Sequence, residues 1–211
     1  MSNWKTPMRL VEYLDKKGRI NKHGIDRLIH GVALAAEMAE QFRCKELLPF
    51  ATSAIRSAKN SEKVLDAVED ATGVRLQILT GEEEARLTFL AVRRWYGWSA
   101  GRICDLDIGG GSLELSVGTN ENPDVALSLE LGAGRLTRDW FDTDPPSRKS
   151  IRKLGEHIDA ELDAHIAEFK DAGPIDVAVG SSKTFRMLAR LTGSAPSSAG
   201  PRVKRTLTQP G

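Results

Sequence analysis

The hydrophobic residues at the start of the chain change between helical and extended spacing. Residues 25–42 carry apolar side chains three or four positions apart, which predicts an amphipathic helix, with Asn21 as a suitable N-terminal cap. A strand is predicted at residues 47–50. A helix should then occupy residues 61–73, capped by its first serine and stopped by its final glycine, before another strand at residues 74–79.

A longer helix is predicted to begin at Gly81 and to end within residues 97–101. Its large apolar residues recur at helical spacing and define the face that we expect to be buried: Leu87, Leu90, Ala91, Trp95 and Trp98. With that face inward, Glu82 points away from it, while Glu83 and Glu84 lie on its flanks. The helix is therefore expected to bring a carboxylate to the border of an apolar surface.

Strands come first in the next part of the chain, and helices follow them. Residues 102–131 contain three successive strand patterns, of which the first two are joined by a glycine-rich turn. After a break at two prolines, the expected order is helix, strand, helix: residues 151–170, 175–179 and 184–191. Residues 193–211 have the Ser, Pro and Gly content of a linker. We therefore expect two α/β domains, residues 1–101 and 102–211.

Composition limits the classes of function. The 211 residues are 40% apolar, enough for one substantial core or two small ones, and 30 basic residues against 29 acidic ones give no field that would favour nucleic acid. No apolar run approaches the ~20 residues of a membrane span, and residues 1–5 lack the apolar region of a signal peptide. We therefore expect a cytoplasmic protein that binds neither nucleic acid nor membrane.

Cysteine and histidine do not suggest a metal site. Cys44 and Cys104 form no Cys-x-x-Cys pair, which argues against a disulfide framework or a thiolate zinc site and suits a reducing compartment. We expect both in the core. The four histidines lack ligand spacing such as His-x-x-x-His and are expected on the surfaces of helices. No metal site is therefore expected to rest on histidine.

The turn between the first two strands of residues 102–131 carries the strongest chemical signal. It combines a carboxylate, three glycines, a hydroxyl and a second carboxylate: Asp107, Gly109, Gly110, Gly111, Ser112 and Glu114. Glycine reaches φ > 0 without a clash and lets backbone N–H groups converge on an anion, and Ser112 can add a donor. Asp107 would then face the cation that accompanies phosphate. A plain Gly-Gly hairpin turn is the alternative.

Two commoner glycine motifs are excluded here. A dinucleotide fingerprint needs its glycines to open a helix, and a Walker loop needs Gly-x-x-x-x-Gly-Lys-Ser/Thr.

The three consecutive glutamates Glu82, Glu83 and Glu84 have two interpretations. Acidic residues in a first helical turn complement the helix dipole. Alternatively, desolvation raises the pKa of a carboxylate at the border of an apolar face, which suits a general base; helical phase does not choose between Glu83 and Glu84.

Two strand-to-helix turns are further candidates for phosphate binding. Thr52 and Ser53 follow the first strand, so they could bind phosphate at a helix start while Arg56 holds a pair of oxygens. A capped helix with a solvated arginine is the alternative. Ser182 and Thr184 repeat the pattern after a later strand, and an ordinary N-cap serine explains it equally well.

Four segments, in this order, resemble the exopolyphosphatase and guanosine pentaphosphate phosphohydrolase family: residues 51–56 with Asn60, 81–87, 107–114 and 132–136. The resemblance covers nearly the whole chain, and the ordered set is far more specific than any single segment. It implies the α/β architecture of actin, Hsp70 and the sugar kinases, which is ribonuclease H-like, with phosphate bound between two domains.

The resemblance also implies roles for single residues. Glu84 is similar to the family's water-activating base, and Arg56 to an arginine of its cleft, so both are expected to be catalytic. Asp107 is similar to a magnesium-site residue, and with Glu114 it is expected to hold Mg²⁺. The residues expected to bind phosphate come from the glycine turn and the later strand-to-helix turn: Gly109, Gly110, Gly111, Ser112, Ser182 and Thr184.

The chain departs from the family pattern in three places. Family members begin with a strand and an Asp-x-Gly-Ser-Asn type turn, the first phosphate loop, which does not precede the first helix here. They also continue beyond the position of Gly211, so both domains are expected to be incomplete. Finally, Ser182-Lys183-Thr184 stands where the family usually has a glycine before the threonine.

These observations support one leading function and two alternatives. The leading hypothesis is a magnesium-dependent homo-oligomer that hydrolyses the terminal phosphoanhydride bond of inorganic polyphosphate or guanosine pentaphosphate. The first alternative is a catalytically silent module that binds polyphosphate or a nucleotide, because the first phosphate loop is missing. A sugar or acid kinase of the same fold is less well supported, since nothing specifies a sugar pocket.

Overall fold

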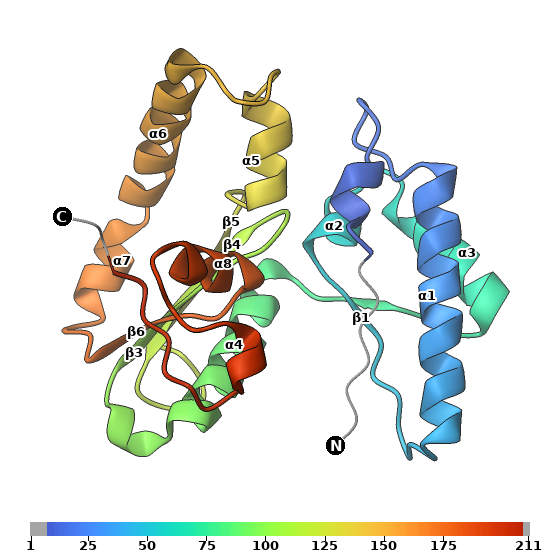
Figure 1. Cartoon of the computed structure of the whole chain (residues 1–211). Coiled ribbons are helices and arrows are strands. Elements are labelled where there is room, and N and C mark those ends of the chain that lie inside the picture. Colours follow the sequence, from blue (N-terminus) through green and yellow to red (C-terminus); the bar gives the residue numbers. More distant parts are fainter. Residues whose placement is uncertain (1–7, 209–211) are drawn as a thin grey trace. The chain divides into compact units, whose positions relative to one another are not determined.

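The computed structural model describes residues 8–208 and divides the chain into two compact units, Met1–Thr80 and Gly81–Gly211 (Figure 1). The expectations for residues 1–5, and the chain end at residues 209–211, lie outside the described part. In that part, no helix has the length and apolar content to cross a membrane.

The first unit contains a small parallel sheet and three α-helices. The elements follow one another as η1 (Leu10–Tyr13), α1 (Lys22–Gln41), β1 (Phe50–Ala51), α2 (Ser53–Arg56), α3 (Ser61–Thr72) and β2 (Gln77–Ile78). β1 pairs with β2 in parallel, with Phe50 opposite Gln77. All the elements predicted for this part of the chain are therefore present, although both strands are short.

The ends of two helices show which sequence signals were used. Asn21 caps α1 as predicted, since its side chain accepts a hydrogen bond from the Gly24 N–H. Gly73 ends α3 in the left-handed conformation with φ 69°. The predicted cap at Ser61 is wrong, because Asn60 is the N-cap residue of α3. The Asn60 amide instead bonds the N–H and C=O of Ile20, both at 2.9 Å, so it joins two segments of this unit.

The first unit has its own apolar core. Ile20, Leu28, Ile55, Val64 and Val68 are among the residues that fill it. Cys44 was expected in a core but is exposed. It follows the end of α1, in a segment without regular structure that leads to β1.

The second unit is built on a four-stranded sheet with the order β5-β4-β3-β6. Its strands are β3 (Ile103–Ile108), β4 (Leu113–Gly118), β5 (Val125–Leu129) and β6 (Val177–Gly180). β3, β4 and β5 are successive antiparallel strands, and β6 returns parallel to β3. The predicted strands at residues 102–131 and 175–179 are confirmed.

Helices cover this sheet from both sides. They are α4 (Gly81–Tyr96), α5 (Ala133–Trp140), α6 (Arg148–Asp163), α7 (Ile166–Asp171) and α8 (Lys183–Leu191), with the short helices η2 (Trp98–Ala100) and η3 (Ser197–Ala199). The sequence analysis did not predict α5, and it treated α6 and α7 as one helix. The expected linker after α8 is instead a structured loop, in which the Arg205 guanidinium donates to the carbonyls of Ala195, Pro196 and Gly200.

Side-chain alternation gives the two faces of the sheet different characters. One face is aliphatic: Leu113, Leu115, Leu129 and Leu131 are buried there against side chains of α5, α6 and α7. On the other face Ile103 packs with Phe89 and Val92 of α4. Because Asp105 and Asp107 alternate with Leu106 along β3, they share the face of Ile103.

Helix α4 packs on its unit with a different face from the one predicted. Leu87, Trp95 and Trp98 are 48%, 65% and 65% exposed, whereas Ala85 and Phe89 are buried. The predicted apolar face is therefore wrong, because Phe89 and Val92, which the prediction did not include, are the side chains that pack against Ile103 of the sheet. This packing also explains why the chain divides after Thr80, before α4, whereas the sequence had suggested a boundary at residue 101.

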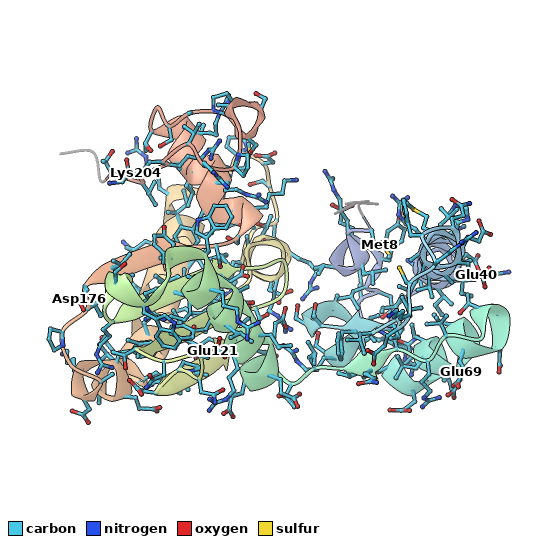
Figure 2. All side chains as sticks on the ribbon, turned by 90° about the horizontal axis from the view of Figure 1, so that it is seen from below. Met8, Glu40, Glu69, Glu121, Asp176 and Lys204 are labelled. Atoms are coloured by element: carbon cyan, nitrogen blue, oxygen red, sulfur yellow. The ribbon has the colours of Figure 1, made fainter. Side chains whose placement is uncertain are left out.

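A buried arginine fixes α4 to the ends of the strands. The side chain of Arg93 is 1% exposed, and its guanidinium donates to the carbonyls of Gly97, Gly101 and Gly118 at 2.6–3.2 Å. The neighbouring Arg94 is exposed and pairs at 2.8 Å with Glu121, which is labelled in Figure 2. Arg93 therefore satisfies three backbone acceptors at the place where α4, β3 and β4 meet.

Replacing this arginine should destabilise the second unit. Arg93→Met retains most of the side-chain volume but leaves the three carbonyls without their donor, so we expect the free energy of unfolding to fall by about 2–4 kcal/mol. Chemical denaturation followed by circular dichroism measures the change. Arg94→Met is the matched control, expected within about 0.5 kcal/mol of the unmodified chain because an exposed ion pair contributes little. Equal losses in the two variants would contradict this role of Arg93.

Candidate active site

The candidate active site is built around the hairpin of β3 and β4. The two strands pair so that Asp107 lies directly opposite Glu114, and Asp105 opposite Ser116. On the next strand Ser128 lies opposite Glu114. The pairing therefore places carboxylates and hydroxyls from three strands on one face of the sheet, the face that α4 covers.

The glycine turn is held by the start of α5. The Gly109 and Gly110 carbonyls accept hydrogen bonds from the N–H groups of Ala133 and Arg135, at 3.0 and 2.9 Å. The Gly111 carbonyl accepts one from Nε of Arg135 at 2.8 Å. One helix start thus binds the carbonyl oxygens of all three glycines.

This arrangement leaves the amides of the turn without acceptors. Within residues 8–208, the N–H groups of Gly110, Gly111 and Ser112 donate to no backbone or side-chain oxygen, although Gly111 and Ser112 are buried. Buried backbone N–H groups are nearly always paired, so donors of this kind indicate a place for an anion. The plain hairpin alternative does not account for them.

The three glycines of the turn do not adopt left-handed backbone. The described glycines with positive φ lie at other positions than Gly109, Gly110 and Gly111, so the expected φ > 0 is not found in the turn. Gly132, at the start of α5, is the glycine that close packing requires. A Cβ there would lie 2.2 Å from the Ser112 nitrogen and 2.3 Å from the Gly111 carbonyl carbon, a distance that only glycine permits.

Glu114 is a buried carboxylate held by two hydroxyls. It is 4% exposed, and Oε1 accepts a hydrogen bond from the Ser128 hydroxyl at 2.9 Å. Desolvation raises the pKa of Glu114, and the hydrogen bonds from Ser112 and Ser128 oppose the shift. The negative charges of Glu84 and Asp107 raise this pKa further. Ser112 is therefore part of the carboxylate site as well as of the glycine turn.

Asp107 and Glu84 complete a group of three carboxylates. Burial raises the pKa of Asp107, the charge of Glu84 raises it further, and the Arg186 guanidinium lowers it. Glu84 is half-buried in the first turn of α4, one residue before the buried Ala85. Glu82 is instead exposed and pairs with Arg86 at 2.7 Å. Glu84 is thus close enough to the other two carboxylates to raise both of their pKa values.

A fourth carboxylate, Asp105, was missed by the sequence analysis. It is 2% exposed, its Oδ2 accepts a hydrogen bond from the Ser181 hydroxyl at 3.4 Å, and its Oδ1 has no partner in residues 8–208. Burial raises its pKa to about 7, and the charge of Asp107 contributes to the shift. The sequence did contain a signal: an aspartate two positions before Asp107 in an apolar strand must lie on the same face.

The turn between β6 and α8 uses its hydroxyls to hold structure. Ser182 is the N-cap of α8 and accepts a hydrogen bond from the Phe185 N–H at 3.2 Å. Thr184 donates to the Ile108 carbonyl at 2.8 Å, and the Ser181 N–H donates to Leu106 at 3.1 Å. This turn is therefore tied to β3 beside the glycine turn, and the ordinary N-cap interpretation describes Ser182.

Arg56 belongs to the first unit. Its guanidinium donates to the Leu79 carbonyl at 2.7 Å, within that unit. Thr52 is the N-cap residue of α2 but makes no side-chain cap hydrogen bond. The structure therefore brings together Glu84, Asp107 and Glu114 of the second unit. The hydrogen bond of Arg56 is within the first unit.

The carboxylates fit a hard cation that prefers oxygen ligands. Buried negative charges close to one another require a compensating cation or a proton, and Glu114 and Asp107 carry raised pKa values for this reason. In the described residues no group of three or more His, Cys, Asp or Glu side chains is arranged so that these side chains alone could hold a metal ion. A Mg²⁺ ion bound by one or two carboxylates takes its other ligands from water and phosphate, so this donor set is suitable.

Comparison with known proteins identifies the family of the chain. Residues 1–210 match the Ppx/GppA phosphatase family, and the chain belongs to that family. It is 59% identical over 211 residues to exopolyphosphatase 1 of Mycobacterium tuberculosis, covering 100% of this chain and 61% of that protein. Exopolyphosphatase 1 of Mycobacterium leprae is 57% identical over 208 residues, which are 99% of this chain and 61% of the relative. The chain thus spans about 61% of the length of these relatives.

Solved structures show the same fold. The Ppx/GppA enzyme of Aquifex aeolicus is 30% identical, with a TM-score of 0.68 over 87% of this chain and 59% of that one. An exopolyphosphatase from Cytophaga hutchinsonii, 22% identical, has a TM-score of 0.77 over 88% of this chain and 62% of that one. The expected fold class, the actin-like α/β fold of this family, is therefore confirmed.

Asp105 should make the stability of the second unit depend on pH. Its folded-state pKa of about 7 lies above the ordinary value of 3.8, so the unfolded chain loses this proton first as pH rises. The free energy of unfolding therefore falls between about pH 4 and pH 7 and levels off above that range. The Asp105→Asn variant lacks this titrating group, so its free energy of unfolding should not show the fall. The free energy of unfolding of the variant minus that of the unmodified chain should therefore be larger at pH 8 than at pH 4.5, by on the order of 2 kcal/mol.

Urea unfolding of both proteins at the two pH values measures this difference. Asp163→Asn, the same chemical change at an exposed position at the end of α6, is the control and should show no such pH dependence. A stability difference between Asp105→Asn and the unmodified chain that stays constant with pH would show that Asp105 keeps an ordinary pKa.

Proposed function

We propose that this chain provides the phosphate-binding and cation-binding part of a magnesium-dependent phosphohydrolase that removes terminal phosphate from inorganic polyphosphate or guanosine pentaphosphate. The observation that carries the proposal is the combination of a glycine turn with unpaired amides, two carboxylates on the adjoining sheet face, Asp107 and Glu114, and Glu84 of α4 close to both. The membership of the chain in the Ppx/GppA phosphatase family and its 59% sequence identity to a mycobacterial exopolyphosphatase support the substrate class.

Each part of the site has a distinct role in this proposal. The N–H groups of Gly110, Gly111 and Ser112 bind oxygens of the phosphate chain, which carry negative charge in the transition state. Asp107 and Glu114 hold Mg²⁺, which would neutralise charge on the phosphate when bound. The hydroxyls of Ser112 and Ser128 fix the orientation of Glu114.

Glu84 is the proposed general base. A water molecule must lose a proton, or be oriented in line with the scissile bond, before it attacks the terminal phosphorus. Of the carboxylates at the site, Glu84 comes from α4, while Asp107 and Glu114 come from the strands. It can therefore act on water while the strand carboxylates hold the cation. Arg56, a residue of the first unit, is proposed to bind phosphate oxygens. Ser182 and Thr184, in the β6–α8 turn, are proposed to support the phosphate site.

The wider setting of the protein is also a proposal. We infer a cytoplasmic homo-oligomer, because two cysteines without a Cys-x-x-Cys pair suit a reducing compartment and apolar side chains are exposed on α8. Met187 and Leu191 are 54% and 81% exposed there. Association would remove such surface from water.

Exchange of Glu84 for its amide tests the proposed base. Glu84→Gln keeps the size of the side chain but cannot take a proton, so phosphate release from polyphosphate with Mg²⁺ should fall by on the order of 10²–10⁴. Binding of polyphosphate, measured by calorimetry, should be retained, because the glycine turn is unchanged. Both the Glu84→Gln variant and the protein with Glu84 are made in a version of the protein that has measurable phosphate release, and their rates are compared.

Glu82→Gln is the matched control, since Glu82 is in the same helical turn but is exposed and paired with Arg86. It should release phosphate at the unmodified rate. An unchanged rate in Glu84→Gln would exclude Glu84 as the base. Polyphosphate binding without any phosphate release in the unmodified protein would favour the alternative of a silent binding module.

A further inference from the structure

A separate cavity of about 340 Å³ lies in the second unit, where β5 meets α5 and α6. Its lining includes Ser128 of β5, Arg135, Asp139 and Trp140 of α5, and His157 and Glu161 of α6. Cavities that bind small molecules begin at about this size and combine apolar walls with a few polar groups. None of the roles proposed above uses this space.

Two aromatic rings form one wall of the cavity. The rings of Trp140 and His157 are stacked, with centroids 4.8 Å apart and an angle of 23° between their planes. An indole face attracts a cation more strongly than the other aromatic side chains do.

The charged groups of the cavity leave one carboxylate available. Glu130 pairs with Arg135 at 3.3 Å, and Asp139 with Arg138 at 2.7 Å. Glu161 also lines the cavity, and in residues 8–208 it makes no ion pair. It follows His157 by four residues on α6, so the two side chains lie on the same side of the helix. The unmatched charge is negative, which opposes binding of phosphate here.

We propose that this cavity binds a small organic cation, an alkylamine such as a diamine or polyamine. The ammonium group would bind the Glu161 carboxylate, and the methylene chain would lie against the indole of Trp140. Two residues that line the cavity also make hydrogen bonds to the candidate active site. Ser128 donates to Glu114, and Arg135 donates to the Gly111 carbonyl, so an amine here would contact residues that shape both parts of the active site.

Calorimetric titration of the chain with spermidine and putrescine at neutral pH and about 0.15 M salt tests the proposal, because screening at that salt weakens non-specific binding to surface charge. We expect saturable binding with one amine per chain. Glu161→Gln should weaken the affinity by at least about 10-fold, because a charge-assisted hydrogen bond is lost. Trp140→Leu should weaken it by about 5-fold through loss of the aromatic face. Circular dichroism and thermal unfolding show whether each variant remains folded.

Glu156→Gln is the matched control, since Glu156 lies on the same helix but is exposed and outside the cavity. Its affinity should equal that of the unmodified chain. Absence of saturable binding, or equal loss in Glu156→Gln and Glu161→Gln, would overturn the proposal. Binding of guanosine in place of the amines, with the same dependence on Glu161, would assign the cavity to a nucleobase and would also overturn it. Because the test measures amine binding alone, it can fail while the proposed phosphohydrolase activity stands.

Discussion

The binding of the glycine-turn carbonyls by α5 is the interaction on which the rest of the site depends. A peptide group has its N–H and C=O on opposite sides, so a carbonyl held toward α5 leaves the N–H of the same peptide directed away from it. Ala133 and Arg135 hold three consecutive carbonyls in this way. Gly132 makes the approach possible, because any side chain there would overlap the turn backbone. The anion-binding amides are thus set by a helix that lies outside the glycine motif itself.

The carboxylates obey a second constraint, which is that their charges are costly to keep buried without a cation. Desolvation is the largest cause of the raised pKa values of Asp107 and Glu114, and the mutual repulsion of the carboxylates adds to it. Two serine hydroxyls reduce this cost at Glu114, but no comparable group is described for Oδ1 of Asp105. The sheet face is therefore suited to a cation in the place where the glycine turn offers amides to an anion, and a phosphate with its metal satisfies both at once.

Most of the fold and the centre of the site could be predicted from the sequence, because both depend on local patterns. The alternation in residues 102–131 determined β3, β4 and β5, and that pairing alone places Asp107 opposite Glu114. The buried face of α4 could not be predicted in this way. The predicted face included the bulky residues Leu87, Trp95 and Trp98, yet burial is decided by the partner surface, and the surface offered by β3 accepts Phe89 and Val92. Helix α5 was missed because glycines at the start of a segment usually argue against a helix, whereas Gly132 is required there by the contact with the turn.

The same contact explains why the sequence motifs of this chain are spread over distant segments. Residues 107–114 supply the turn and the carboxylates, while residues 132–136 supply the helix start that orients them. In the proposed function neither segment would bind phosphate well without the other, because free amides that are not held in place lose their convergence. Ser128 precedes the second segment and Arg135 belongs to it, and both also line the separate cavity. A change at that cavity would therefore act on the glycine turn through the hydrogen bond from Arg135 to the Gly111 carbonyl and on the Glu114 carboxylate through the hydrogen bond from Ser128.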